Sequence, residues 1–94
     1  MALIVQKFGG TSVGSIERIR HVASKAVGTR KAGHDLVVVV SAMAGETDRL
    51  IRLAKEMADK PAGREYDVMV STGEQISVAL LAMAIQSLGY HAVS

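Results

Sequence analysis

The sequence contains no cysteine, no tryptophan and a single proline, and its aromatic residues are one phenylalanine and two tyrosines. Without cysteine the chain has no disulfide, no thiolate metal ligand and no cysteine nucleophile. With so few aromatic rings it offers little surface for stacking on nucleobases, and its 11 basic residues are interspersed with nine acidic ones. These absences argue against a nucleic-acid-binding protein, and the small net charge of +2 is better suited to anionic small molecules.

A basic segment before the first apolar run is also absent, and that run is too short for a signal peptide. We therefore expect a soluble cytoplasmic protein. The 94 residues are enough for one small domain, whose core must be mainly aliphatic. A membrane span is the alternative for the long apolar stretch 68–88, but Gly73, Glu74 and Gln75 at its centre argue against one.

The most informative stretch is Lys7-Phe8-Gly9-Gly10-Thr11-Ser12-Val13-Gly14, which lies between an apolar run and a segment with helical periodicity. A strand, a glycine-rich turn and a helix in this order bring backbone N–H groups and the positive end of a helix dipole together, which suits an anion. The glycines allow close approach of a ligand, and Lys7 adds a cation. The stretch is neither a Walker A loop nor a Gly-x-Gly-x-x-Gly fingerprint. Local chemistry therefore predicts a phosphate site, with a simple tight connection as the open alternative.

The first half of the chain predicts two buried strands, 2–8 and 35–41, joined by a helix over 16–32. Ser15 is the expected N-cap of this helix and Gly33 its expected C′ residue. A unit of this length predicts parallel strands and a right-handed crossover, with ligands beyond the carboxyl ends of the strands. Ser41 lies at such an end, which favours a binding role over that of an ordinary turn serine.

The second half predicts a helix opening at Glu46 or Thr47, with Thr47 as its N-cap, and a short linker at 61–63. The stretch 64–88 then predicts a largely buried helix in its later half, with a short strand at 66–70 as a competing interpretation. Residues 90–94 resemble the start of a third strand. Glu74 is costly inside an apolar helix unless it is partnered, so it is either a surface residue in a salt bridge or an acceptor for a substrate ammonium.

Three ordered matches connect the chain to a known family. Lys7 to Val13, directly after an N-terminal strand, closely resembles the opening signature of aspartate kinases, within the amino-acid kinase superfamily; Val37 to Met43 and Ser71 to Gln75 continue the match. The resemblance implies an α/β fold, a three-layer αβα architecture with a mainly parallel sheet of the carbamate kinase-like type. Residues 1–94 would be the N-terminal portion of that catalytic domain, three strands and three helices, with the rest of the kinase domain and the ACT regulatory domains absent.

The implied activity is transfer of the γ-phosphoryl group of ATP to the side-chain carboxylate of L-aspartate, giving 4-phospho-L-aspartate. This reaction opens the biosynthesis of lysine, threonine, methionine and isoleucine. By resemblance Lys7 is the catalytic cation, and Glu74 holds the aspartate ammonium while Thr47 holds a carboxylate. ATP would be bound by Lys7, Phe8, Gly9, Gly10, Thr11 and Ser41, and aspartate by Ser41, Thr47 and Glu74.

The cofactors implied are ATP and Mg²⁺, and because no protein metal ligand is identified, the ion is expected to be held mainly by phosphate oxygens. The partners implied are ATP and L-aspartate, with no nucleic acid and no membrane, and a homo-oligomer in the full-length enzyme.

The family's later catalytic aspartate and its substrate-binding arginine have no counterpart here, so we expect the isolated segment to be inactive.

Three alternatives remain open at this point. The chain could come from a superfamily member acting on glutamate, acetylglutamate, carbamate or a nucleoside monophosphate. It could belong to the bifunctional form fused to homoserine dehydrogenase, which shares the motifs. It could also be a nucleotide-binding fragment without catalysis. The sequence does not predict which end product inhibits the enzyme.

Overall fold

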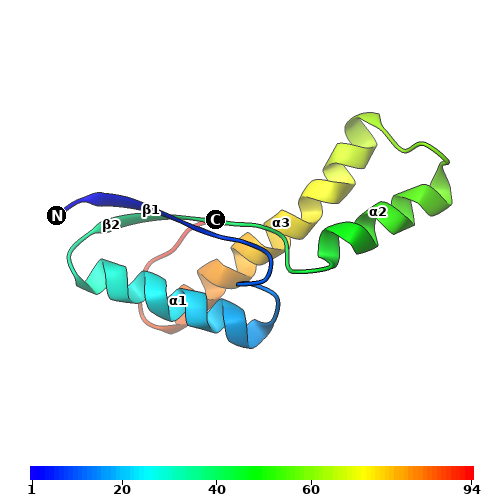
Figure 1. The fold of residues 1–94 in the computed structure, drawn as a ribbon. Helices are drawn as coiled ribbons and strands as arrows, with labels where there is room; N and C mark the ends of the chain where they lie inside the picture. Colours follow the sequence, from blue (N-terminus) through cyan, green and yellow to red (C-terminus); the bar gives the residue numbers. More distant parts are fainter.

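The computed structural model describes all residues 1–94 as two strands and three helices (Figure 1). In chain order the elements are β1 (Leu3–Phe8), α1 (Ile16–Lys31), β2 (Asp35–Val40), α2 (Glu46–Met57) and α3 (Gly63–Ser87). The two strands pair in parallel, with Phe8 opposite Val40. The predicted strand–helix–strand unit is thereby confirmed.

Helix α1 begins and ends where its sequence predicts. The hydroxyl of Ser15 accepts a hydrogen bond from the Arg18 backbone N–H at 3.2 Å, which caps the first turn. Gly33 takes a positive φ of 93° just past the helix, a conformation that a side chain would disfavour. The chain therefore leaves α1 in the direction needed to enter β2.

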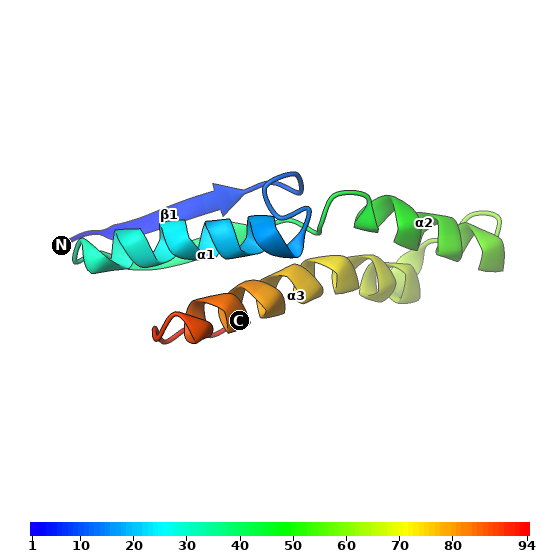
Figure 2. The same cartoon turned by 90° about the horizontal axis from the view of Figure 1, so that it is seen from below.

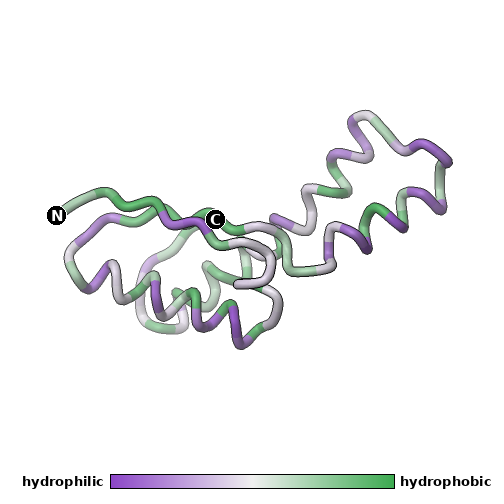
Figure 3. Tube along the Cα trace, viewed as in Figure 1, coloured by the Kyte–Doolittle hydropathy of each residue, from purple (hydrophilic) through white to green (hydrophobic).

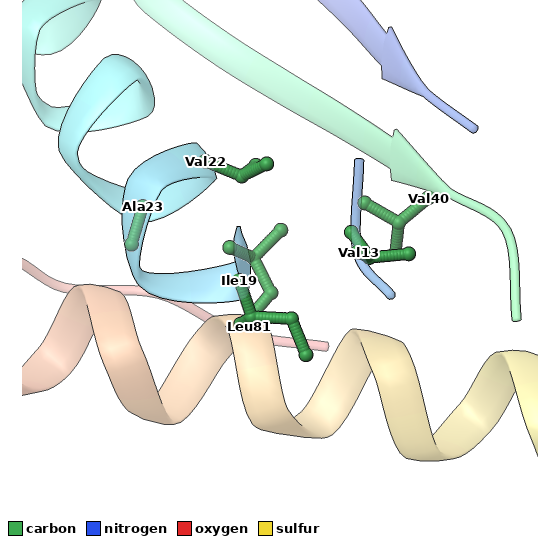
Figure 4. Close-up of a cluster of buried hydrophobic side chains, with 6 residues drawn as sticks. All are labelled: Val13, Ile19, Val22, Ala23, Val40 and Leu81. Carbon is green, nitrogen blue, oxygen red and sulfur yellow. The ribbon is translucent and has the colours of Figure 1, made fainter. Parts of the chain in front are cut away.

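The core lies between the sheet, α1 and the later half of α3 (Figure 4). It consists of aliphatic side chains, as the shortage of aromatic residues predicts: Val13, Ile19, Val22, Ala23, Val40 and Leu81. Val13 is fully buried although it belongs to the loop between β1 and α1. Its burial anchors the end of the glycine-rich loop to the body of the domain.

The opposite face of the sheet is uncovered. Side chains alternate along a strand, so that Phe8 and Val38 pack against the core while their neighbours point the other way. The uncovered aliphatic residues are Leu3 (69% exposed), Val5 (63%), Val37 (48%) and Val39 (45%). Residues 1–94 thus provide the sheet and one helical layer of an αβα arrangement.

Helices α2 and α3 form a hairpin that projects from this body, as two views show (Figures 1 and 2). The molecule is accordingly elongated, with extents of 50 × 24 × 18 Å. Along α2 hydrophobic and hydrophilic residues recur with helical spacing (Figure 3), and Leu50 and Ala54 are buried on its inner side. The later half of α3 packs on α1, so α3 joins the hairpin to the core.

Several details of the second half differ from expectation. Residues 66–70 belong to α3 and not to a strand; Tyr66, Met69, Val70 and Gly73 face inward at helical spacing. Residues 90–94 form no strand, because their backbone groups pair with no neighbouring strand.

The N-cap of α2 is Gly45 and not Thr47, because the chain turns into the helix at a left-handed residue with φ 83°. The later half of α3 is also less buried than predicted: Met83 is 61% exposed, whereas Gly73, Ser77 and Leu81 are the residues of α3 that are buried. Its apolar residues therefore extend beyond the face that the other elements cover.

Helix α3 is long and apolar enough to cross a membrane by length and composition, and 17% of its most apolar window is buried in the structure. A single helix of this kind is weak support for a membrane span. Its side chains Leu81 and Ile85 pack in or against the core, as in the central helix of a globular domain.

Candidate functional site

The glycine-rich loop follows β1 at the carboxyl end of the sheet and is a series of tight turns. The N–H groups of Ser12, Val13 and Gly14 donate to carbonyl oxygens three residues earlier, at 3.1 to 3.3 Å. By contrast, the N–H groups of residues 9–11 donate to no atom of the chain. Three successive backbone donors are therefore available to an external acceptor, as a phosphate-binding loop requires.

This loop is held against the loop that follows β2. The Ser41 N–H donates to the Phe8 carbonyl at 3.2 Å, and the Ala44 N–H donates to the Gly10 carbonyl at 3.2 Å. Gly10 is needed for this contact, because a Cβ at that position would stand 2.9 Å from the Ala42 carbonyl oxygen. Gly9 has no atom within 4 Å of its Cβ position. Glycine at position 9 thus leaves open space beside the free donors.

Lys7 is exposed and makes no ion pair or hydrogen bond. It precedes Phe8, whose side chain packs against the core, so Lys7 points to the opposite face of the sheet from α1. Its ammonium is therefore free to approach a ligand beyond the strand ends from that side. Phe8 belongs to the site through its backbone, since its ring is directed into the packed side.

The residues expected from the sequence to bind the second substrate lie on the later part of the chain, after β2 and on α2 and α3. Ser41 is half-buried directly after β2, and Thr47 is exposed in the first turn of α2. Glu74 is also exposed and forms no ion pair, so the salt bridge that was one of its two expected roles is absent. Its neighbour Gly73 packs on Ala42, which places the helix that carries Glu74 against the loop that carries Ser41.

Two further charged residues lie at this end of the fold, and sequence reasoning did not single them out. Arg18 donates through Nη1 to the Thr11 carbonyl at 2.7 Å. Arg49 bonds Glu46 through both its Nε and its Nη2. The i, i+3 spacing of Glu46 and Arg49 was a signal available in the sequence.

The ion pair between Glu46 and Arg49 shifts the pKa of both side chains. The hydrogen bond from the Arg49 guanidinium, with the attraction of its charge, holds the pKa of the Glu46 carboxyl below its usual value. The same bond raises the pKa of Arg49. Glu46 is therefore ionised at neutral pH and its charge is already matched, whereas Glu74 forms no ion pair.

No group of three histidine, aspartate or glutamate side chains converges anywhere in the chain. A cavity of about 680 Å³ lies between α1, β2, α3 and the C-terminal residues, and its walls are mainly apolar. None of the candidate site residues lines it. The free backbone donors and the charges beside them thus lie outside this cavity, at the carboxyl ends of the strands.

Comparisons with known proteins identify the family of the chain. The sequence profile of the amino acid kinase family matches residues 2–94. The chain is 67% identical to the aspartate kinase of Pseudomonas putida and 55% identical to aspartokinase 2 of Bacillus subtilis, over its whole length and 23% of each relative. It thus spans about a quarter of the length of these curated relatives.

Among solved structures, the chain is similar to the aspartate kinase of Synechocystis, with a TM-score of 0.93 and 53% identity over 97% of this chain and 16% of that one. The family match over residues 2–94 includes the glycine-rich loop, the Ser41 loop and α3. The chain belongs to the amino acid kinase family.

Proposed function

We propose that residues 1–94 form the N-terminal part of an aspartate kinase catalytic domain, which phosphorylates the side-chain carboxylate of L-aspartate with ATP. The observation that carries the proposal is the set of three free backbone donors at residues 9–11, together with the unpaired lysine, Lys7, near the end of the strand that precedes them. Phosphoryl transfer depends on positioning and on neutralisation of charge, and this arrangement can supply both. The names of the relatives support aspartate as the acceptor.

In the proposed reaction a carboxylate oxygen of aspartate attacks the γ-phosphorus, and the bond from that phosphorus to the β–γ bridging oxygen breaks. The electron pair of that bond leaves on ADP. The N–H groups of Gly9, Gly10 and Thr11 would hold phosphate oxygens, and Lys7 would neutralise charge on the transferring group. Ser41, whose backbone is fixed to Phe8, would contact both the phosphates and the acceptor.

On the acceptor side, the unpaired carboxylate of Glu74 would bind the aspartate ammonium. Thr47, in the first turn of α2, would bind a carboxylate, and the positive end of the α2 dipole would favour it. The three free N–H groups of residues 9–11 fit a nucleotide phosphate. Mg²⁺ would be held mainly by phosphate oxygens, because no acidic cluster is present. Mg²⁺ would supply charge neutralisation at those oxygens.

We extend the proposal to the whole enzyme. The enzyme would act in the cytoplasm, as a homo-oligomer, at the first step of lysine, threonine, methionine and isoleucine biosynthesis. The remainder of the catalytic domain and ACT regulatory domains would lie in the part of the polypeptide beyond these 94 residues. Residues 1–94 alone would not catalyse the reaction, because they would supply one side of the site.

The test is Lys7→Ala in the full-length polypeptide, with Lys25→Ala as a control that removes an exposed, unpaired lysine from α1. Aspartyl phosphate is trapped with hydroxylamine. Lys7→Ala should lower kcat by about 100-fold or more with the fold intact, and Lys25→Ala should change it by less than about twofold. A wild-type protein that consumes ATP with glutamate or carbamate but not with aspartate would refute the proposed acceptor.

A further inference from the structure

Gly73 lies at the tightest point between α3 and the loop that follows β2. It is buried, and a Cβ in its place would stand 3.1 Å from the Ala42 Cβ, 3.3 Å from the Glu46 Cγ and 3.4 Å from a Leu50 methyl carbon. The first two distances are shorter than ordinary carbon–carbon contacts. Glycine is a poor helix former, so its presence in the middle of α3 has a steric reason at this position.

Ala42 is in turn packed on its other side. It is 6% exposed, and its carbonyl oxygen lies 2.9 Å from the Cβ position of Gly10. Ala42 therefore stands between two glycines, one in the phosphate-binding loop and one in α3. A single residue thus separates the backbone of the loop from the backbone of the helix.

Each of these three residues adjoins a candidate site residue. Gly10 belongs to the donor loop, Ala42 follows Ser41, and Gly73 precedes Glu74. The spacing of Gly10, Ala42 and Gly73 therefore determines the distance between the loop proposed to bind the nucleotide phosphates and the part of α3 proposed to bind aspartate. Rates of group transfer fall steeply when this kind of spacing changes by a fraction of an ångström to one ångström.

We propose that Gly73 is a positioning residue that fixes Glu74, and with it the bound aspartate, at the correct distance from the glycine-rich loop. The inference rests on the proposed function, because it takes Glu74 as the group that binds aspartate. Gly73 itself would touch neither substrate. Its role would be to let α3 approach Ala42 closely. Enlarging it should displace the acceptor while the free N–H groups of the loop remain in place.

The test is Gly73→Ala in the full-length polypeptide, with Gly28→Ala as the matched control. Gly28 is also a helical glycine, in the last turn of α1, but no atom lies within 4 Å of its Cβ position. Gly73→Ala should lower kcat/KM for aspartate by about tenfold or more and change the KM for ATP by less than about twofold. Gly28→Ala should change neither constant by more than about twofold.

A second substitution makes the test specific to the contact. Removing the Ala42 methyl should relieve the shortest of these contacts, the one at 3.1 Å, so Ala42→Gly in the Gly73→Ala background should restore kcat/KM for aspartate to within about threefold of the Ala42→Gly single variant. If Gly73→Ala alone does not fold, the double variant should fold and show that same restored constant. Failure of the double variant to recover either property would overturn the inference.

The outcomes separate this inference from the proposed function. An active wild-type enzyme with unchanged aspartate kinetics in Gly73→Ala would refute the positioning role and leave the proposed function intact. Equal losses for aspartate and ATP would also refute it, because they would show general damage to the site. A wild-type enzyme that transfers no phosphate to aspartate would refute both.

Discussion

The guanidinium of Arg18, in the first turn of α1, donates to the backbone carbonyl of Thr11 across 2.7 Å. The bond ties the middle of the glycine-rich loop to the helix that follows it. The carbonyl is thereby turned toward α1, and the positive charge of Arg18 stands beside a loop proposed to hold phosphate. Arg18 is thus a structural support of the loop that the family motif itself does not include.

Arg18→Ala should therefore weaken ATP binding by loosening the loop. We expect the KM for ATP to rise by about three- to tenfold, as for the loss of one typical hydrogen bond at an exposed position, with a smaller change in the KM for aspartate. Arg20→Ala is the control, since Arg20 is exposed and makes no hydrogen bond. Equal effects of the two substitutions would show that only net charge matters.

Glu74→Gln should act on the other substrate. Removing the unpaired carboxylate should raise the KM for aspartate by about tenfold or more and leave the KM for ATP within about twofold, because the lost attraction is to the substrate ammonium. Glu56→Gln removes an exposed carboxylate from α2 and serves as the control. Steady-state kinetics with each substrate varied in turn make the comparison. A selective effect on ATP would contradict the assignment.

The two adjacent glycines of the loop should differ in their tolerance of a methyl group. Gly10→Ala should lower the free energy of unfolding by about 1–3 kcal/mol, because its Cβ would meet the Ala42 carbonyl oxygen. Gly9→Ala should change it by less than about 0.5 kcal/mol, since its Cβ would point into open space. Urea unfolding of both variants tests the difference. Equal destabilisation would show that backbone conformation, and not the contact with Ala42, requires glycine.

Leu81 should be among the most important residues of α3 for stability. It is 4% exposed and joins α3 to α1 in the core, so Leu81→Ala should lower the free energy of unfolding by about 2–5 kcal/mol. Met83→Ala, two residues along the same helix, removes a largely exposed side chain and should cost less than about 0.5 kcal/mol. Thermal or urea unfolding gives the comparison, and similar losses would place the packing surface of α3 elsewhere.

The Glu46–Arg49 pair predicts a pH-dependent contribution to stability. The pKa of Glu46 is lower in the folded chain than its ordinary value of 4.5, so folding favours the ionised carboxylate. The contribution is therefore present above that value and is lost as the pH falls through the folded pKa. The difference in Tm between wild type and Glu46→Gln should hold steady above that value and shrink as the pH is lowered below it. A difference that stays constant with pH would show that the charge of Glu46 is not responsible.

Local signals in the sequence predicted most of the first half correctly. Apolar runs, the Ser15 cap and Gly33 predicted β1, α1 and β2 because each signal depends on residues close together in the chain. The alternation of Tyr66 and Val68 was misleading, since a five-residue window fits both strand and helix periodicity. Residues 90–94 were misjudged because a strand requires a partner, which local sequence does not reveal.

The candidate site was predictable only as separate pieces. The motif at residues 7–14 indicated where donors would lie, and the structure leaves the N–H groups of residues 9–11 free. The packing of Ala42 between Gly10 and Gly73 depends on segments far apart in the sequence and on glycine positions with no periodic signal. The roles of Lys7, Ser41, Thr47 and Glu74 in binding remain predictions for the kinetic tests above.

Helix α3 has a mechanical consequence, because it runs without interruption from the tip of the hairpin to the core. At 1.5 Å per residue, Glu74 lies about 10 Å from Leu81 along the axis, and Arg64 lies about 25 Å from it. If α3 tilts as a rigid rod about its anchored end at Leu81, the tip moves roughly 2.5 times as far as Glu74. The α2–α3 hairpin then acts as a lever. A force applied at its tip moves Glu74 by a smaller distance and acts there with greater strength.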